Sequence, residues 1–165
     1  MKTINELCDV VRKTAYAIHI YHGHGHLEKI YENALANRLR KLGIEVKQQH
    51  PLAVYDEDGT VLGEYFADLL VDGRLIVELK ASRATADEHV AQILGYLKSA
   101  KIEDGILINF GSHKFEIRKF VMSRTTVQPT LKAPSFFLSL AFLAFFGGQS
   151  IPPAVTVHPI FTNVN

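Results

Sequence analysis

The hydrophobic positions near the start of the chain repeat with the period of an α-helix. In residues 3–21 and again in residues 27–42, apolar side chains recur three and four positions apart, which predicts two amphipathic helices. The segment between them contains two glycines, which favour a loop. Gly43 follows the second repeat, at the position where a C-terminal helix cap is expected.

After Gly43 the period changes, and the pattern predicts three strands over residues 44–55, 61–71 and 75–81. Asp-Gly pairs between them are strong turn signals. Pro51 indicates that the first strand lies at a sheet edge or bends, because proline cannot donate a ladder hydrogen bond. The third strand contains the run LIVEL, which is typical of a strand buried on both faces.

The remaining charged part of the chain predicts one more helix and two more strands. Residues 86–99 carry apolar side chains at helical spacing, and residues 105–110 and 114–121 are predicted strands separated by Gly111-Ser112. The predicted order is therefore helix, helix, three strands, helix, two strands. We find no internal repeat.

Charge divides the chain into two parts. All 17 acidic residues and all but one of the 18 lysines and arginines precede residue 125, the exception being Lys132. We interpret residues 1–124 as the domain and residues 125–165 as an apolar, charge-poor extension. Residues 136–146 are uncharged, but a membrane-spanning helix needs about 20 apolar residues. Docking onto the domain, a protein partner or a second copy is favoured over membrane insertion, and a poorly ordered extension is the alternative.

Composition narrows the class of protein. The 165 residues suit one domain, and the single cysteine, Cys8, excludes a disulfide framework and a multi-cysteine zinc site. The start lacks a signal-peptide pattern, so we expect a cytoplasmic location. A net charge of +1 counts mildly against a high-affinity nucleic-acid binder. His22, His24 and His26 alternate, but no fourth ligand is evident for zinc.

The candidate chemistry lies in residues 66–80, which contain Asp68, Glu78 and Lys80. Glu78 and Lys80 are two apart on a predicted strand and therefore point to the same face. An E-x-K pair alone is common and is also explained by a plain ion pair on an exposed strand. Here apolar neighbours surround it, and burying these charges is costly unless they are paired or bind a metal.

Whether Asp68 joins that face depends on the intervening turn. A two-residue Asp72-Gly73 loop would pair Asp68 with Val77 and direct the aspartate to the other face. A three-residue loop that includes Arg74 pairs Asp68 with Glu78 and starts the two carboxylates about 5 Å apart. We predict the second register. Two carboxylates so close repel each other, and Mg²⁺ or Mn²⁺ is the natural cation to bridge them.

Three motifs in order resemble a known family. Gly25, Glu28 and Tyr31 read G-x-x-E-x-x-Y, the pattern D-x9-E-x-K follows, and Gln92-x-x-x-Tyr96 comes last. Together they resemble the GxxExxY family of the PD-(D/E)XK nuclease superfamily over about residues 4–121. One departure is Ala67, which stands where the superfamily pattern has proline.

The resemblance implies an α/β (α+β) fold with a restriction-endonuclease-like αβββαβ core, in which helices flank a mixed sheet. It implies Asp68, Glu78 and the helical acid Glu28 as metal ligands, and Lys80 as the catalytic lysine. Glu28 is alternatively a first-turn acid favoured by the helix dipole.

The same resemblance implies that Gln92 and Tyr96, with Tyr31, shape the site. Tyr96 is alternatively an amphipathic residue at the core edge. The expected function is a Mg²⁺-dependent phosphodiester hydrolase, a nuclease that acts on DNA. A catalytically silent nuclease-fold module that binds nucleic acid or protein is the alternative. We expect a basic set to meet the phosphate backbone: Arg83, Lys98, Lys114, Arg118 and Lys119.

Overall fold

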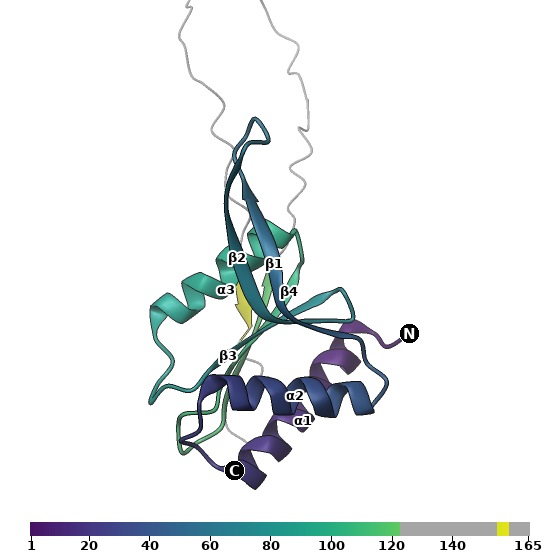
Figure 1. Cartoon of the computed structure of the whole chain (residues 1–165), viewed down its shortest axis with the longest axis vertical. Helices are drawn as coiled ribbons and strands as arrows, with labels where there is room; N and C mark the ends of the chain where they lie inside the picture. The colour runs from purple at the N-terminus through teal and green to yellow at the C-terminus, as the bar shows by residue number, and fades with distance from the viewer. Residues whose placement is uncertain (123–154, 159–165) are drawn as a thin grey trace, which may run out of the picture.

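The computed structural model describes residues 1–122 and 155–158. Three helices and six strands are described, and Figure 1 labels most of them. The helices are α1 (Ile4–His22), α2 (Glu28–Lys41) and α3 (Asp87–Ala100). The strands are β1 (Val46–Tyr55), β2 (Val61–Val71), β3 (Leu75–Lys80), β4 (Asp104–Asn109), β5 (Glu116–Met122) and β6 (Val155–His158).

The described strands form one mixed sheet in the order β1-β2-β3-β4-β5-β6. β3 and β4 are parallel and are connected through α3, whereas the other neighbouring strands are antiparallel. A parallel pair needs a long crossover connection, which the helix supplies. The central strand β3 is buried along residues 75–79, as its unbroken apolar run predicts.

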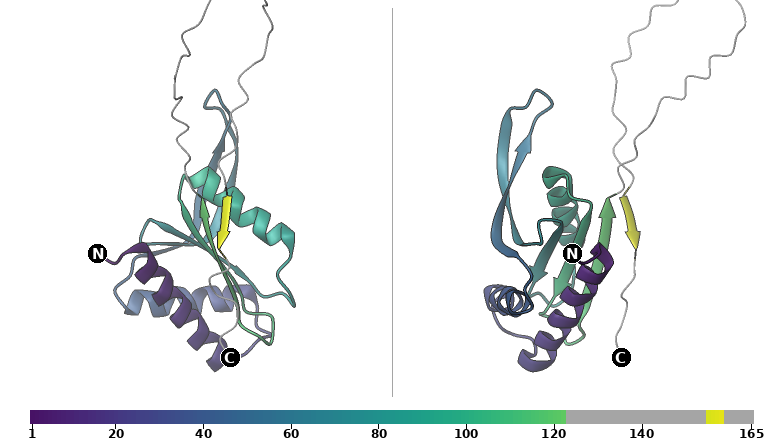
Figure 2. Two further views of the ribbon diagram at one scale, coloured as in Figure 1. Left: turned by 180° about the vertical axis from the view of Figure 1, so that it is seen from behind. Right: turned by 90° about the vertical axis from the view of Figure 1, so that its right-hand side faces the viewer.

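Two hydrophobic clusters lie on opposite faces of the sheet. α1 and α2 pack against one face, which Leu75, Val77 and Leu79 of β3 help to form. α3 packs against the other face, which includes Ile76. Figures 1 and 2 show α1 and α2 together and α3 apart from them. Because side chains alternate along a strand, Glu78 shares the face of Ile76 and lies on the side of α3.

The β2–β3 connection fixes which side chains meet across the hairpin. Val71 pairs with Leu75, so the loop has three residues, as predicted, and within it Asp72 and Gly73 adopt positive φ values of 52° and 67°. Further along the same ladder, Leu70 pairs with Ile76 and Leu69 pairs with Val77. One further step in the same register sets Asp68 opposite Glu78.

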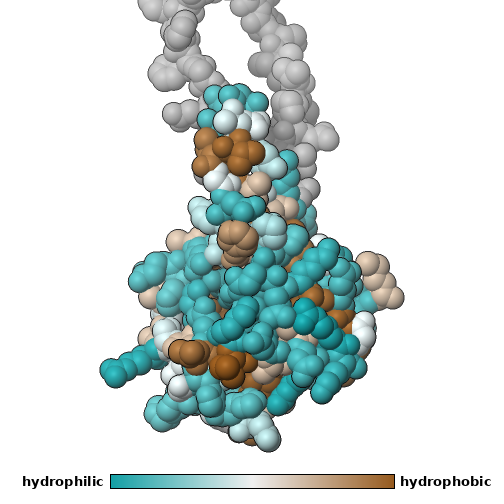
Figure 3. Space-filling model, viewed as in Figure 1, coloured by the Kyte–Doolittle hydropathy of each residue, from teal (hydrophilic) through white to brown (hydrophobic). Residues whose placement is uncertain are grey.

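The outer part of the β1–β2 hairpin projects beyond the helices (Figures 1 and 2). β1 is an edge strand among the described residues, which explains how it tolerates Pro51. Residues 61–66 of β2 are all exposed. Figure 3 shows apolar surface on this projecting hairpin, where Val61 and Leu62 are exposed.

The observed elements confirm the predicted fold class and match the predicted ranges to within two residues. The strand β6 was not predicted; it pairs antiparallel with β5. Residues 136–146, for which docking was expected, lie outside the described residues. Within the described ranges, none of the helices combines the length and apolar character needed to cross a membrane.

Candidate active site

The carboxylate of Asp68 is buried and held from two sides. Its Oδ2 accepts a hydrogen bond from the backbone N–H of Leu79 at 2.8 Å, and its Oδ1 accepts one from Nε2 of Gln49 at 3.2 Å. Only 9% of the residue is exposed. Burial raises the pKa of Asp68, and the Leu79 N–H and the charge of Lys80 act against that rise. The bond to Leu79 connects β2 directly to the strand that carries Glu78.

Glu78 and Lys80 form an ion pair on β3. Nζ of Lys80 donates to Oε1 of Glu78 at 2.7 Å. The side chain of Lys80 is 13% exposed and that of Glu78 is 2% exposed. The other oxygen, Oε2 of Glu78, is buried and has no hydrogen-bond partner among the described residues. An unsatisfied buried carboxylate oxygen is costly, so this atom marks a place where a cation or donor fits.

The electrostatics of the pair follow from this burial. Burial, reinforced by the negative charge of Asp68, raises the pKa of Glu78 to about 7, although Lys80 acts in the opposite direction. Burial by itself would lower the pKa of Lys80, but Glu78, Glu28 and Asp68 together raise it. The lysine therefore stays protonated, while Glu78 gains a proton far more readily than an exposed glutamate.

Glu28 lies at the start of α2 and is half-buried. Burial raises its pKa most, the charge of Lys80 and the nearby backbone N–H of Ala81 lower it, and the charge of Asp68 raises it. The structure thus brings Glu28 into the electrostatic field of the other two acids. Within residues 1–122 and 155–158, however, no three acidic, histidine or cysteine side chains converge closely enough to hold a metal ion without movement.

Gln92 and Tyr96 lie one turn apart on α3, as predicted, and Nε2 of Gln92 donates to the Tyr96 hydroxyl at 2.6 Å. Tyr96 is buried, and its pKa is raised by burial first and also by the negative charge of Glu78. Its ring lies 5.3 Å from that of Tyr65 on β2. The helix therefore presents this pair toward the acidic site.

Tyr31 is fully buried and cannot reach a substrate. Its hydroxyl donates to the carbonyl oxygen of Gly23 at 2.9 Å and accepts from the backbone N–H of His26 at 3.2 Å. The ring stacks on Phe110 with centroids 4.5 Å apart. Any influence of Tyr31 on the site is exerted through the α1–α2 loop, which leads into Glu28.

The histidines meet in a way that the sequence did not indicate. Nε2 of His24 lies 2.9 Å from Nδ1 of His113, so the α1–α2 loop contacts the β4–β5 turn. His22 and His26 have ring centroids 5.8 Å apart. In the described part of the chain, no three of these side chains form a metal-binding group.

The predicted basic set is wrong for Lys119. This residue is 7% exposed, and its Nζ lies 3.2 Å from Asp104 Oδ1 and donates to Asn5 Oδ1 at 3.0 Å. It points to the α1 side of the sheet because it alternates with Arg118, which is exposed. Lys119 is a structural residue, and it is not free to contact a phosphate backbone.

Two polar residues near the site were missed by the sequence analysis. Glu32 is 2% exposed on α2, and Gln49 of β1 connects it to Asp68. The available signal was the position of Glu32 in the helical stripe that also contains Leu35 and Leu39, where a charge is unexpected. Nothing in the alternation of β1 distinguishes Gln49 from Gln48.

The donor set fits a hard divalent cation. Carboxylate oxygens are the side-chain ligands that Mg²⁺ and Mn²⁺ prefer. Oε2 of Glu78 lacks a partner, and each oxygen of Asp68 has one hydrogen bond and can accept a second interaction.

The fold and this arrangement of acids and lysine define a nuclease-like domain. The chain belongs to the PD-(D/E)XK nuclease superfamily, because the model of that family matches residues 5–120, more than half of the sequence. No curated protein matches the chain. Among solved structures, the crystal structure of SSO0001 is similar at 20% identity and a TM-score of 0.46; the match covers 55% of this chain and 48% of that one. This chain thus spans about half the length of that protein.

Proposed function

We propose that the chain is a metal-dependent nuclease that hydrolyses phosphodiester bonds, with DNA as the expected substrate. The observation that carries the proposal is the unpartnered, buried Oε2 of Glu78 beside the carboxylate of Asp68 and the ammonium of Lys80. Burying two carboxylates among apolar strands costs free energy, and a site without function has no physical reason to keep them there. Membership in a superfamily of nucleases supports the same reading.

In this proposal Asp68 and Glu78 hold Mg²⁺ or Mn²⁺, and Glu28 completes the ligand set. When bound, the cation supplies Lewis acidity and offsets negative charge on the phosphate. Lys80 orients the attacking water and stabilises charge on the phosphate through its ammonium group. Gln92 and Tyr96 line the side of α3 and limit the space available to the substrate. Assignment to the GxxExxY family, a cytoplasmic location and partner binding through residues 136–146 remain predictions.

The test compares cleavage of single- and double-stranded DNA and RNA by wild type, Lys80→Met and Lys13→Met, each with Mg²⁺, Mn²⁺ or EDTA. Lys80→Met removes the charge and keeps the hydrocarbon length, and Lys13 is an exposed lysine of α1, outside the predicted basic set, that serves as the matched control. We expect metal-dependent cleavage that falls at least 100-fold in Lys80→Met and stays unchanged in the control. Equal cleavage by all three proteins would reveal a contaminant.

The alternative is a catalytically silent module of the same fold that binds nucleic acid or protein. The near-neutral net charge favours it slightly, because it gives no general attraction to a polyanion. Thermal melts with and without Mn²⁺ distinguish the two functions. A melting temperature that rises with the metal, and does not rise in Asp68→Asn, supports the enzyme; no response in either protein supports the silent module.

A further inference from the structure

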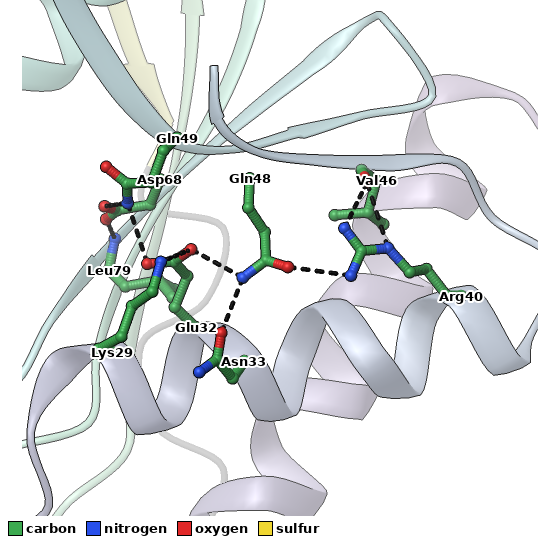
Figure 4. A network of polar contacts seen from close by, with 9 residues as sticks. All are labelled: Lys29, Glu32, Asn33, Arg40, Val46, Gln48, Gln49, Asp68 and Leu79. Atoms are coloured by element: carbon green, nitrogen blue, oxygen red, sulfur yellow. Dashed lines mark hydrogen bonds and ion pairs between the residues drawn. The ribbon is translucent and has the colours of Figure 1, made fainter.

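A chain of hydrogen bonds crosses four elements behind the candidate metal site (Figure 4). Oε2 of Glu32 on α2 accepts from Nε2 of Gln49 on β1 at 2.9 Å. The same amide nitrogen donates to Oδ1 of Asp68 on β2 at 3.2 Å, and Oδ2 of Asp68 accepts from the N–H of Leu79 on β3 at 2.8 Å. One amide group therefore lies between two buried carboxylates that would otherwise repel each other.

Glu32 is itself firmly anchored. Its Oε1 accepts from Nζ of Lys29 at 2.7 Å and from Nε2 of Gln48 at 2.8 Å. Gln48 is held in turn by Arg40, whose guanidinium also donates to the carbonyl oxygen of Val46. With three donors on its carboxylate, Glu32 provides a fixed point from which Gln49 reaches the site.

The backbone of Gln49 adopts a conformation that glutamine rarely takes. Its φ is 49°, in the left-handed region, which costs a residue with a Cβ roughly 1–2 kcal/mol. Gln49 lies between Gln48 and His50, which pair regularly with Leu69 and Ala67 of β2. Local strain of this kind persists where surrounding contacts impose it, and it clusters at functional sites.

We propose that Gln49 is a positioning residue that orients the carboxylate of Asp68 for cation binding, with Glu32 as its anchor. This inference rests on the proposed metal site and adds two residues to it. Gln49 fixes Oδ1 as the backbone of Leu79 fixes Oδ2, so the aspartate is held in one orientation before the cation arrives. Partners of this kind behind a metal ligand typically change metal affinity by about 10–100-fold when they are removed.

Gln49→Asn separates this role from a purely structural one. Asparagine is well tolerated at positive φ, so the substitution relieves backbone strain, but its side chain is one methylene too short to bridge the two acids. Glu32 keeps Lys29 and Gln48 as partners and is not left unpaired. Gln48→Asn is the matched control, because Gln48 donates to the same glutamate and forms no hydrogen bond with Asp68.

The experiment measures Mn²⁺ binding by calorimetry and thermal unfolding in EDTA for wild type and both variants. We expect Mn²⁺ affinity about 10-fold weaker in Gln49→Asn and within threefold of wild type in Gln48→Asn, with melting temperatures in EDTA that stay close to wild type. Gln49→Met keeps the side-chain length and removes the amide, so it should weaken Mn²⁺ binding equally. It replaces Gln49→Asn in the experiment if the asparagine disturbs folding.

Three results would overturn the inference in distinguishable ways. Undiminished Mn²⁺ affinity in both Gln49 variants would refute the positioning role and leave the proposed function intact. An equal loss in the Gln48 and Gln49 variants would show that the effect passes through Glu32 and the fold, not through Asp68. Wild-type protein that binds no Mn²⁺ would refute the proposed metal site together with this inference.

Discussion

Replacing Glu78 by glutamine should stabilise the metal-free protein at alkaline pH. The folded-state pKa of Glu78 is raised from 4.5 to about 7, so its stabilising contribution is complete below pH 4.5 and is lost as pH rises through 7. The two pKa values differ by an amount that corresponds to about 3 kcal/mol. That figure already includes the favourable bond to Lys80. Glutamine never ionises and keeps a carbonyl oxygen for Lys80, so it avoids most of this cost.

The assay is urea unfolding of wild type and Glu78→Gln in EDTA at pH 4.5 and pH 8. We expect nearly equal free energies of unfolding at pH 4.5 and an advantage of about 2–3 kcal/mol for the variant at pH 8. Added Mg²⁺ should stabilise wild type at pH 8, because a ligand that binds only the folded state raises the free energy of unfolding. It should leave the variant unchanged, because Glu78→Gln removes one of the proposed carboxylate ligands. A difference between the two proteins that does not vary with pH would refute the reasoning.

Other predictions follow from the same contacts. Mg²⁺ affinity of wild type, measured by calorimetry, should rise between pH 5.5 and pH 8 and then level off, because Glu78 must lose its proton to bind the cation; a flat profile would exclude it as a ligand. Gly111→Ala should lower the free energy of unfolding by more than about 2 kcal/mol, since its Cβ would lie 2.3 Å from the carbonyl carbon of Ala81. The control Gly95→Ala meets nothing within 4 Å on α3 and should stabilise by up to about 1 kcal/mol. Lys119→Met should reduce stability by about 1–3 kcal/mol without changing DNA affinity, because Asp104 and Asn5 lose the ammonium group that pairs with them; weaker DNA binding of the variant in titrations would show that Lys119 contacts DNA.

The sequence predicted the elements and the central register because those features depend on local patterns. The β2–β3 loop needs two residues that accept positive φ, which Asp72 and Gly73 supply, and the alternation of β3 assigned Glu78 and Lys80 to one face. The role of the helical acid Glu28 as a metal ligand stays a prediction; burial, and after it the charge of Asp68, raises its pKa.

What the sequence did not reveal depends on contacts between distant elements. Gln49 meets Glu32 from 17 residues away in the chain, and no spacing rule predicts that pairing. Lys119 was assigned to the surface by its charge, whereas a single step of strand alternation directs it toward Asp104 and the buried side of the sheet. Charge alone does not determine which face of a strand a residue occupies.

The three-residue loop between β2 and β3 has a consequence for the order in which the protein folds. Closing so short a loop costs little chain entropy, and hairpins form within about 1–10 μs. Asp68 and Glu78 therefore come together while water still surrounds them and screens their repulsion. The desolvation of Glu78 comes later, when α3 covers that face of the sheet. We expect a rise from pH 5 to pH 8 to increase the unfolding rate of the metal-free chain by a larger factor than it decreases the refolding rate. Stopped-flow kinetics at the two pH values would measure both factors.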